Sequence, residues 1–312
     1  MGAKVATPFG VLLLLGSALC PVGTAAAPIP VMLLDGESAG AYHDWRLTTP
    51  VLKSELEETG LFQVDVVTAP SSSAPTGALN GFKPDFSKYR AIVFNYDAPD
   101  WPAGLKDSFE RYMRSGGGLV IVHAADNAFP GWKEYNEMIG LGGWRSRTEA
   151  AGPYWFYKDG KLVSDSSAGP TGSHGSRLPF QVTTREPEHP VMKGLPAIWM
   201  HQGDELYATL RGPGANMTVL ATAHSDPSNN GTGRDEPILI ALTWGKGRIF
   251  HTTMGHDVSA LSCAGFIATF QRGTEWAATG KVTQKVPKDF PSATTVSYRA
   301  DIVAMNTPAI NK

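Results

Sequence analysis

The sequence predicts an α/β fold in which helices cover a mostly parallel central sheet. Short, continuously apolar runs at residues 29–34 and 91–94 are typical of strands that are buried on both faces. Amphipathic stretches with helical spacing separate such runs, and this alternation indicates a parallel sheet. The glycines at 116–118 lead into a further apolar run that ends at His123 and Asp126. Open α/β sheets bind ligands beyond the carboxyl ends of their strands, so we expect chemistry there.

In the first half of the chain, regular patterns follow one another closely. Thr49 fits as a helix N-cap with Pro50 at the first helical position, and Gly60 ends that helix. An apolar stripe at Leu105, Phe109, Tyr112 and Met113 marks a second helix. The serine-, proline- and glycine-rich residues 68–88 indicate a surface loop. The strands expected here are 29–34, 62–67, 91–94 and the run after Gly118.

In the second half, regular patterns frame a long irregular segment. Residues 131–139 have the spacing of a short helix, whereas residues 140 to about 180 show no regular hydrophobic pattern. Such a segment is either a binding loop or an inert excursion. Two apolar runs around Gly245-Lys246-Gly247 predict a β-hairpin. The elements expected beyond 180 are strands 180–184, 206–210 and 219–223, the hairpin 237–244 with 248–253, and a helix at 261–279.

The first 27 residues have the pattern of a secretory signal peptide. Lys4 precedes an apolar core at 9–15, and Ala25-Ala26-Ala27 supplies small residues for cleavage. We therefore expect a secreted or periplasmic protein with an α/β domain at 28–280 and a polar tail at 281–312. No later stretch is long and apolar enough for a membrane span. The net charge of -2, without a basic block, argues against a nucleic-acid partner, whereas a homo-oligomer stays open.

Histidines beside acids are the main chemical signal. Histidine with a neighbouring carboxylate is the unit of general acid/base catalysis and of metal ligation. No H-E-x-x-H motif and no cysteine pair is present, so a divalent metal held by separate loops stays open and its identity unknown. His251 also fits a core histidine, and His174 and His224 fit solvated loops. The histidines that flank predicted strands are His43, His123, His201, His251 and His256.

Aromatic residues near the predicted strand ends favour a sugar ligand, because flat rings stack on the C–H faces of a sugar. Tyr42, Trp45, Trp132 and Trp144 all lie in or near predicted loops, although each alone also fits ordinary packing. The sequence lacks the motifs of several other enzyme classes. No serine-hydrolase elbow or phosphate-binding glycine loop is present, and Cys263 has no histidine nearby in sequence.

Several motifs, taken in order, resemble those of one family. They are residues 116–125 with Trp132 and Tyr135, then 189–196, 204–207, 245–250, 255–257 and 276–277. Together they resemble the trehalose-utilisation (ThuA-like) family of the class I glutamine amidotransferase-like superfamily. The resemblance implies a flavodoxin-like three-layer sandwich without the superfamily's catalytic cysteine, and a role in the use of disaccharides and their 3-keto derivatives. Trp144-Arg145 stands where the family's histidine–proline pair is expected, which puts that histidine's ligand role in doubt.

We therefore expect an exported carbohydrate-active enzyme that cleaves a glycosidic bond, by hydrolysis or elimination, in a disaccharide or keto-sugar. The expected base is His123 or His256, with Asp126, Asp204 or Glu205 as the acid or orienting group. The alternatives are a non-catalytic sugar-binding or accessory module of a sugar-oxidation pathway, and a partner of an oxidoreductase that acts through the tail. The residues expected to contact a small carbohydrate are Tyr42, His43, Asp44, Trp45, Trp132, His201 and Tyr207.

Overall fold

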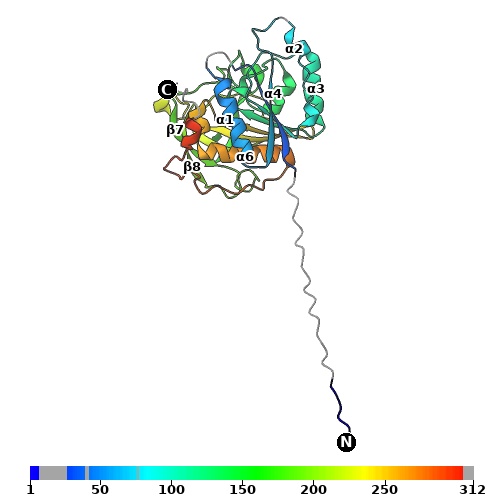
Figure 1. The fold of residues 1–312 in the computed structure, drawn as a ribbon. Coiled ribbons are helices and arrows are strands. Elements are labelled where there is room, and N and C mark those ends of the chain that lie inside the picture. Colours follow the sequence, from blue (N-terminus) through cyan, green and yellow to red (C-terminus); the bar gives the residue numbers. More distant parts are fainter. Residues whose placement is uncertain (7–26, 39–41, 76, 305–312) are drawn as a thin grey trace, which may run out of the picture.

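The computed structural model describes residues 1–6, 27–38, 42–75 and 77–304. In these residues, helices flank one sheet of eleven strands (Figure 1). The strands are β1 (Ile29–Asp35), β2 (Phe62–Thr68), β3 (Ala91–Phe94), β4 (Gly118–Val122), β5 (Tyr154–Lys158), β6 (Lys161–Asp165), β7 (Leu178–Thr184), β8 (Ile198–Asp204), β9 (Met217–His224), β10 (Asp235–Trp244) and β11 (Gly247–Thr252). The helices are α1 (Trp45–Glu57), α2 (Ala78–Gly81), α3 (Ala103–Arg114), α4 (Lys133–Ile139), α5 (Val258–Leu261), α6 (Ala264–Thr279) and α7 (Ala300–Ala304).

Parallel pairing extends over only half of the sheet. Strands β2, β1, β3, β4 and β11 are parallel neighbours, as the alternation of strands and helices predicts. From β11 through β10, β9, β7 and β8, every neighbour is antiparallel. The α/β class is confirmed, but the expectation of a mostly parallel sheet is wrong, and the flavodoxin-like detail is not confirmed. The physical reason is that loops, rather than crossover helices, connect the strands from β7 to β11.

Both faces of the sheet are covered, which gives three layers. In β1, Val31 and Leu33 belong to the core beneath α1 and α6. Met32 and Leu34 point to the opposite face and pack with residues of α3 and α4. This alternation follows from the two-residue period of a strand, and it explains why the run at 29–34 is apolar throughout.

Helix α1 begins one turn earlier than the sequence suggested. Asp44, rather than Thr49, is the N-cap, and its Oδ1 accepts the backbone N–H of Arg46 at 3.0 Å. Pro50 therefore lies inside the helix, where its missing N–H removes one helical hydrogen bond. The early cap matters for the site, because it fixes the chain directly after His43.

Two features of the second half differ from the expected elements. The predicted strand at 206–210 is not formed, because β8 ends at Asp204 and the apolar residues Leu206, Tyr207 and Leu210 pack into the core from irregular chain. The segment 140–180, expected to be irregular, contains the hairpin β5–β6. Its turn residues Asp159 and Gly160 both have positive φ, the geometry of a tight hairpin turn.

Residues 281–304 lie against the α/β body. The carbonyl of Gln284 accepts a hydrogen bond from Arg272 of α6 at 3.1 Å, and that of Ser292 accepts the N–H of Met200 in β8 at 2.8 Å. The predicted signal peptide falls mainly on residues 7–26, outside the described residues. No helix in the described ranges has the length and apolar character needed to traverse a bilayer.

Candidate functional site

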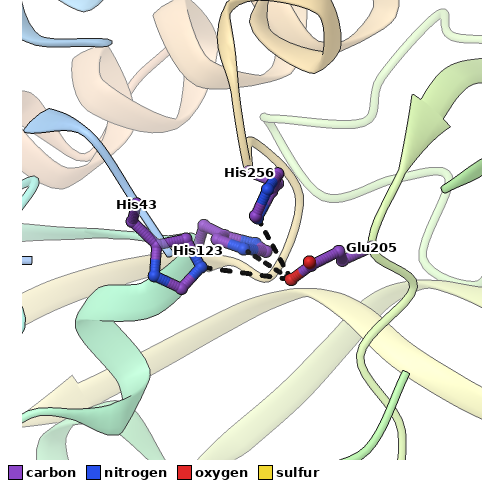
Figure 2. Close-up of side chains that lie close together, drawn as sticks. All are labelled: His43, His123, Glu205 and His256. Carbon is purple, nitrogen blue, oxygen red and sulfur yellow. Dashed lines mark ion pairs between the residues drawn. The ribbon is translucent and has the colours of Figure 1, made fainter. Parts of the chain in front are cut away.

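Four side chains converge beyond the ends of strands from both halves of the sheet (Figure 2). His43 follows β1 and His123 follows β4, whereas Glu205 follows β8 and His256 follows β11. Three strands separate β8 from β11 in the sheet order. The antiparallel half of the sheet is therefore curved, so that Glu205 after β8 and His256 after β11 meet at the same edge of the sheet.

The carboxylate of Glu205 lies at the centre of this cluster. Its Oε2 is 3.1 Å from His256 Nδ1, 3.6 Å from His123 Nε2 and 4.0 Å from His43 Nε2. One ligand-type atom from each of the four residues lies within 4.8 Å of all the others. The side chains of Glu205 and His43 are only 13% and 14% exposed, so the cluster is largely shielded from bulk water.

Hydrogen bonding orients His123 towards the cluster. Its Nδ1 is 2.7 Å from the carbonyl of Thr253, and since a carbonyl only accepts, Nδ1 carries the proton and donates it. In the neutral ring, Nε2 is then left with a free lone pair that points at Glu205. His123 also has a left-handed backbone, with φ of 46°, which is costly for a residue other than glycine.

The electrostatics of the cluster are strongly coupled. Burial opposes the charge of Glu205, but His123 and His256 outweigh it and hold the pKa of this carboxyl well below its usual range. Burial and the neighbouring histidines His123 and His256 lower the pKa of His43 to about 3. His43 is therefore neutral at physiological pH, the form in which histidine binds a metal.

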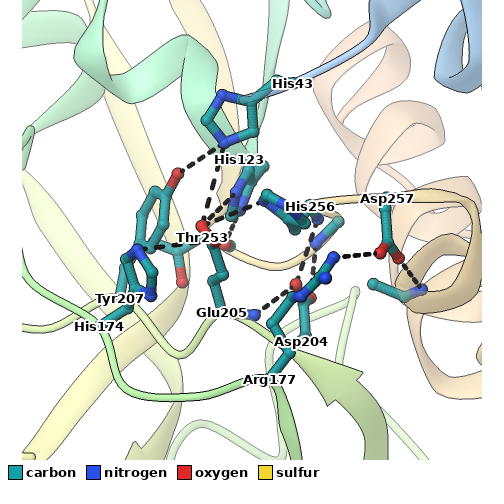
Figure 3. A network of polar contacts seen from close by, with 12 residues as sticks. His43, His123, His174, Arg177, Asp204, Glu205, Tyr207, Thr253, His256 and Asp257 are labelled. Atoms are coloured by element: carbon teal, nitrogen blue, oxygen red, sulfur yellow. Dashed lines mark hydrogen bonds and ion pairs between the residues drawn. The ribbon is translucent and has the colours of Figure 1, made fainter. Parts of the chain in front are cut away.

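The buried carboxylate of Asp204 supports the cluster (Figure 3). Asp204 points away from Glu205, into the interior, where its Oδ2 lies 2.9 Å from His201 Nε2. The same carboxylate accepts the backbone N–H groups of Gly255 at 2.7 Å and of His256 at 3.1 Å. Burial opposes this charge, yet His201 and the N–H groups keep the pKa of Asp204 below its usual value.

The four residues fit a divalent metal of the zinc type. Nitrogen and oxygen ligands lie 2.0–2.2 Å from zinc, which places them about 3.3 Å apart in a tetrahedron. The separations of 3.1 to 4.0 Å around Glu205 need only small side-chain movements to match. In addition, His123 Nε2 and His256 Nδ1 are buried without a hydrogen-bond partner among the described residues. Buried polar atoms of that kind need a partner, and a cation would provide one.

A cavity of about 760 Å³ opens beside the cluster. This volume lies within the range of pockets that hold small organic ligands. Its walls come from the loops after β1, β2, β3, β4 and β8 and from the segment 140–175. The lining residues are Glu37, Tyr42, His43, Ser72, Asp97, Pro99, Asn127, Trp144, Arg145, His174, Glu205 and Tyr207.

Comparison with known proteins identifies the family. The family model described as ThuA, trehalose utilisation, matches residues 31–277. The chain belongs to this family. A solved ThuA-like protein from Parabacteroides merdae is 48% identical, with a TM-score of 0.84 over 88% of this chain and 99% of that one. Another from Bacteroides uniformis is 20% identical, with a TM-score of 0.55 over 85% and 97%. The comparison with curated proteins gave no match.

In this ThuA-family fold, several of the residues expected at the site do lie there. His43, His123, His256 and Glu205 form the cluster, and Tyr207 contacts it through its hydroxyl, 3.4 Å from His43 Nε2. Tyr42 is exposed at the cavity wall. His201 and Asp204 are buried behind the cluster rather than in the cavity.

Other expected residues lie elsewhere. Asp126 is fully buried, and its carboxylate faces His251 Nε2 at 3.5 Å instead of His123. Trp132 packs among buried aromatic rings and donates its indole N–H to Glu110. Asp44 caps α1, and Trp45 begins that helix beneath the guanidinium of Arg46. These positions do not bring the side chains of Asp126 and Trp132 to the cavity wall.

The sequence did not reveal part of the cavity wall. His174, expected in a solvated loop, lies with Nε2 3.6 Å from Glu205 Oε1. Asp97, Asn127 and Glu37 also line the cavity, and no sequence motif marks them. The only available signal was position, because Asp97 and Asn127 follow the buried strands β3 and β4.

Proposed function

We propose that this ThuA-family protein is a divalent-metal-dependent enzyme that cleaves a glycosidic bond in a disaccharide or its keto derivative. The observation that carries the proposal is the convergence of three imidazoles on the Glu205 carboxylate. The trehalose-utilisation family supports a carbohydrate as the substrate. A module that only bound sugar would have no need of such a cluster beside its cavity.

The metal would be held by His43, His123, His256 and Glu205, and it would supply Lewis acidity that polarises a sugar oxygen. This use of His123 and His256 leaves His174, which lines the cavity, as the group best placed to move a proton. Burial raises the pKa of Tyr207 well above its ordinary value, so this phenol stays protonated and can donate a hydrogen bond to the substrate.

A keto-sugar suits this arrangement because its carbonyl acidifies the neighbouring C–H bond. His174 accepts that proton, the electron pair forms a carbon–carbon double bond, and the glycosidic C–O bond breaks. The departing sugar oxygen takes the proton back from His174. Water then adds across the double bond, so that the net reaction is hydrolysis and no oxidant or reductant is consumed.

Hydrolysis by a pair of carboxylates has less support. It requires two carboxyl groups that flank the scissile bond. Asp204 and Glu205 are adjacent in sequence, but Asp204 is buried and committed to His201 and to backbone N–H groups. Glu205 is itself surrounded by histidines. This pair therefore cannot act from opposite sides of a sugar.

Metal content and turnover, measured together, test the proposal. Purified wild-type protein should bind about one divalent ion per chain, as determined by elemental analysis, and should release glucose from 3-ketotrehalose. His123→Ala should lose both the ion and turnover, because it removes a ligand. His224→Ala is the matched control, since His224 pairs with Asp235 on the surface, away from the cluster.

Full turnover by metal-free protein would contradict the metal proposal. Undiminished ion binding by His123→Ala would contradict the assignment of the ligands. Thermal unfolding of each variant shows whether the loss is local or reflects misfolding.

Export is a separate part of the proposal, supported by the apolar core at 9–15 and the alanines before residue 28. The mature protein should begin near Pro28 when the chain is produced with its own leader in a secreting host. If N-terminal sequencing finds residues 1–27 still present on the product, the proposal of export with a cleaved leader is contradicted.

A further inference from the structure

The cavity is also lined by polar residues outside the histidine–glutamate cluster. His43 and His174 line it together with Glu205, whose carboxylate each of them contacts. Its wall also includes Asp97 and Arg145, which come from the loop after β3 and from the segment after α4. These two residues bind each other and not the cluster, so they form a second set of polar groups on the same cavity.

A strained turn holds part of this second set in place. Trp144, Arg145 and Ser146 have φ values of 48°, 46° and 62°, so three consecutive residues other than glycine adopt the left-handed conformation. Each such residue costs free energy, and strain of this kind persists where the surrounding structure enforces it, often at ligand sites. The indole of Trp144 packs against Gly172, whose missing side chain leaves room for it, and beside the tilted ring of Tyr207, with ring centroids 4.5 Å apart. The indole stays partly exposed where it lines the cavity.

Asp97 and Arg145 pair in a way that leaves hydrogen-bonding capacity unused. Arg145 Nε donates to Asp97 Oδ1 at 2.6 Å, and Nη2 donates to the Asp97 carbonyl at 3.2 Å. Within the described residues, Arg145 Nη1 has no acceptor and Asp97 Oδ2 has no donor. The pair therefore offers one free acceptor and one free donor, and both suit hydroxyl groups, because each hydroxyl can both donate and accept.

The charges here disfavour an anionic ligand. Glu37 and Asp97 line the same cavity, and Arg145, which also lines it, is paired with Asp97. A phosphate or carboxylate group would meet two carboxylates and an arginine that is already paired. A neutral polyol meets no such repulsion, and an aromatic ring beside paired polar groups suits its apolar face.

We propose that Trp144, Arg145 and Asp97 form a subsite for a second, neutral sugar ring, in which Trp144 stacks on the ring while Asp97 and Arg145 bind adjacent hydroxyls. The inference rests on the proposed function and deepens it by naming the residues that bind the second ring. The ring that reacts lies at the histidine–glutamate cluster. The ring that leaves lies against Trp144.

Calorimetric titration of the zinc-loaded full chain with trehalose tests the subsite. Arg145→Ala should weaken trehalose binding about tenfold or more, since hydrogen bonds to charged groups are lost. Trp144→Ala should weaken it by a similar factor through lost stacking. Arg234→Ala is the matched control, because Arg234 is also a partly exposed arginine paired with an aspartate, Asp165, outside the cavity.

Zinc content, measured on the same samples, separates this inference from the proposed function. Loss of trehalose affinity in Arg145→Ala with zinc retained supports the subsite. Three results would overturn the subsite. They are wild-type trehalose affinity in Arg145→Ala, an equal loss of affinity in Arg234→Ala, and zinc-loaded wild-type protein that binds no trehalose. Wild-type protein that binds no zinc overturns the metal proposal instead. If Trp144→Ala does not fold, Trp144→Phe keeps a ring and should bind more tightly than Arg145→Ala.

Discussion

The carboxylate of Asp204 fixes His256 through the main chain, because Asp204 Oδ1 accepts the backbone N–H of His256 at 3.1 Å (Figure 3). The same carboxylate is continuous in sequence with Glu205, whose own N–H it also accepts at 2.8 Å. One buried side chain thus positions two members of the cluster that come from opposite ends of the antiparallel half of the sheet.

Replacing Asp204 by asparagine should therefore weaken metal binding without removing a ligand. The amide NH₂ group would face the N–H groups that the carboxylate now accepts, so the loop carrying His256 loses its anchor. Loss of an outer partner of this kind lowers metal affinity about 10–100-fold. Competition against a chelating dye measures the change. Asp257→Asn is the control, since Asp257 caps α5 and pairs with the exposed Arg177, and equal affinities in both variants would refute the assignment.

The stability that Asp97→Asn gains over the wild-type protein should depend on pH in a defined direction. Burial, partly offset by Arg145, raises the pKa of Asp97 to about 6 from 3.8. The neutral carboxyl is the form that the fold favours, so its contribution to stability is fully present below pH 3.8 and is lost as the pH rises through about 6. The ionised form therefore destabilises the fold at pH 7.5. Asparagine cannot ionise, and it should stabilise the protein by about 1–3 kcal/mol at pH 7.5.

This gain should shrink towards zero near pH 4, as followed by thermal unfolding of both proteins across pH 4–8. The same variant should bind trehalose more weakly, so that stability and function move in opposite directions. A lower melting temperature for Asp97→Asn at pH 7.5 would show that the ion pair with Arg145 stabilises the fold on balance.

The parallel half of the fold could be predicted because its signals are local. Strand β4 follows two glycines, is apolar throughout and is followed directly by His123, and each of these features is visible in sequence. Strand β8 carries polar residues such as His201 and Gln202 among its apolar ones. Its place depends on contacts with α5, α6 and the tail, which no local pattern encodes. The prediction of a strand at 206–210 was wrong, because the stretch is apolar through burial in the core and not through membership of the sheet.

The candidate site divides in the same way. His123, Glu205 and His256 could be named because each follows a strand or lies beside an acid. His174 and Arg145 lie in a segment without periodicity, where the decisive feature is a left-handed backbone at 144–146. Nothing in the residue types Trp, Arg and Ser favours that conformation, so tertiary contacts must impose it.

Close packing of α6 against β11, behind the site, should make Gly273 intolerant of any side chain. A Cβ at this position would collide with the ring of Phe250. Gly273→Ala should therefore destabilise the protein by about 1–3 kcal/mol, although alanine is intrinsically the better helix former. Gly104 in α3 provides the opposite case, because a Cβ there meets no heavy atom within 4 Å, and Gly104→Ala should stabilise by about 0.5 kcal/mol. Denaturant unfolding measures both, and a gain in stability for Gly273→Ala would mean that Phe250 moves freely and that α6 does not hold β11 in place.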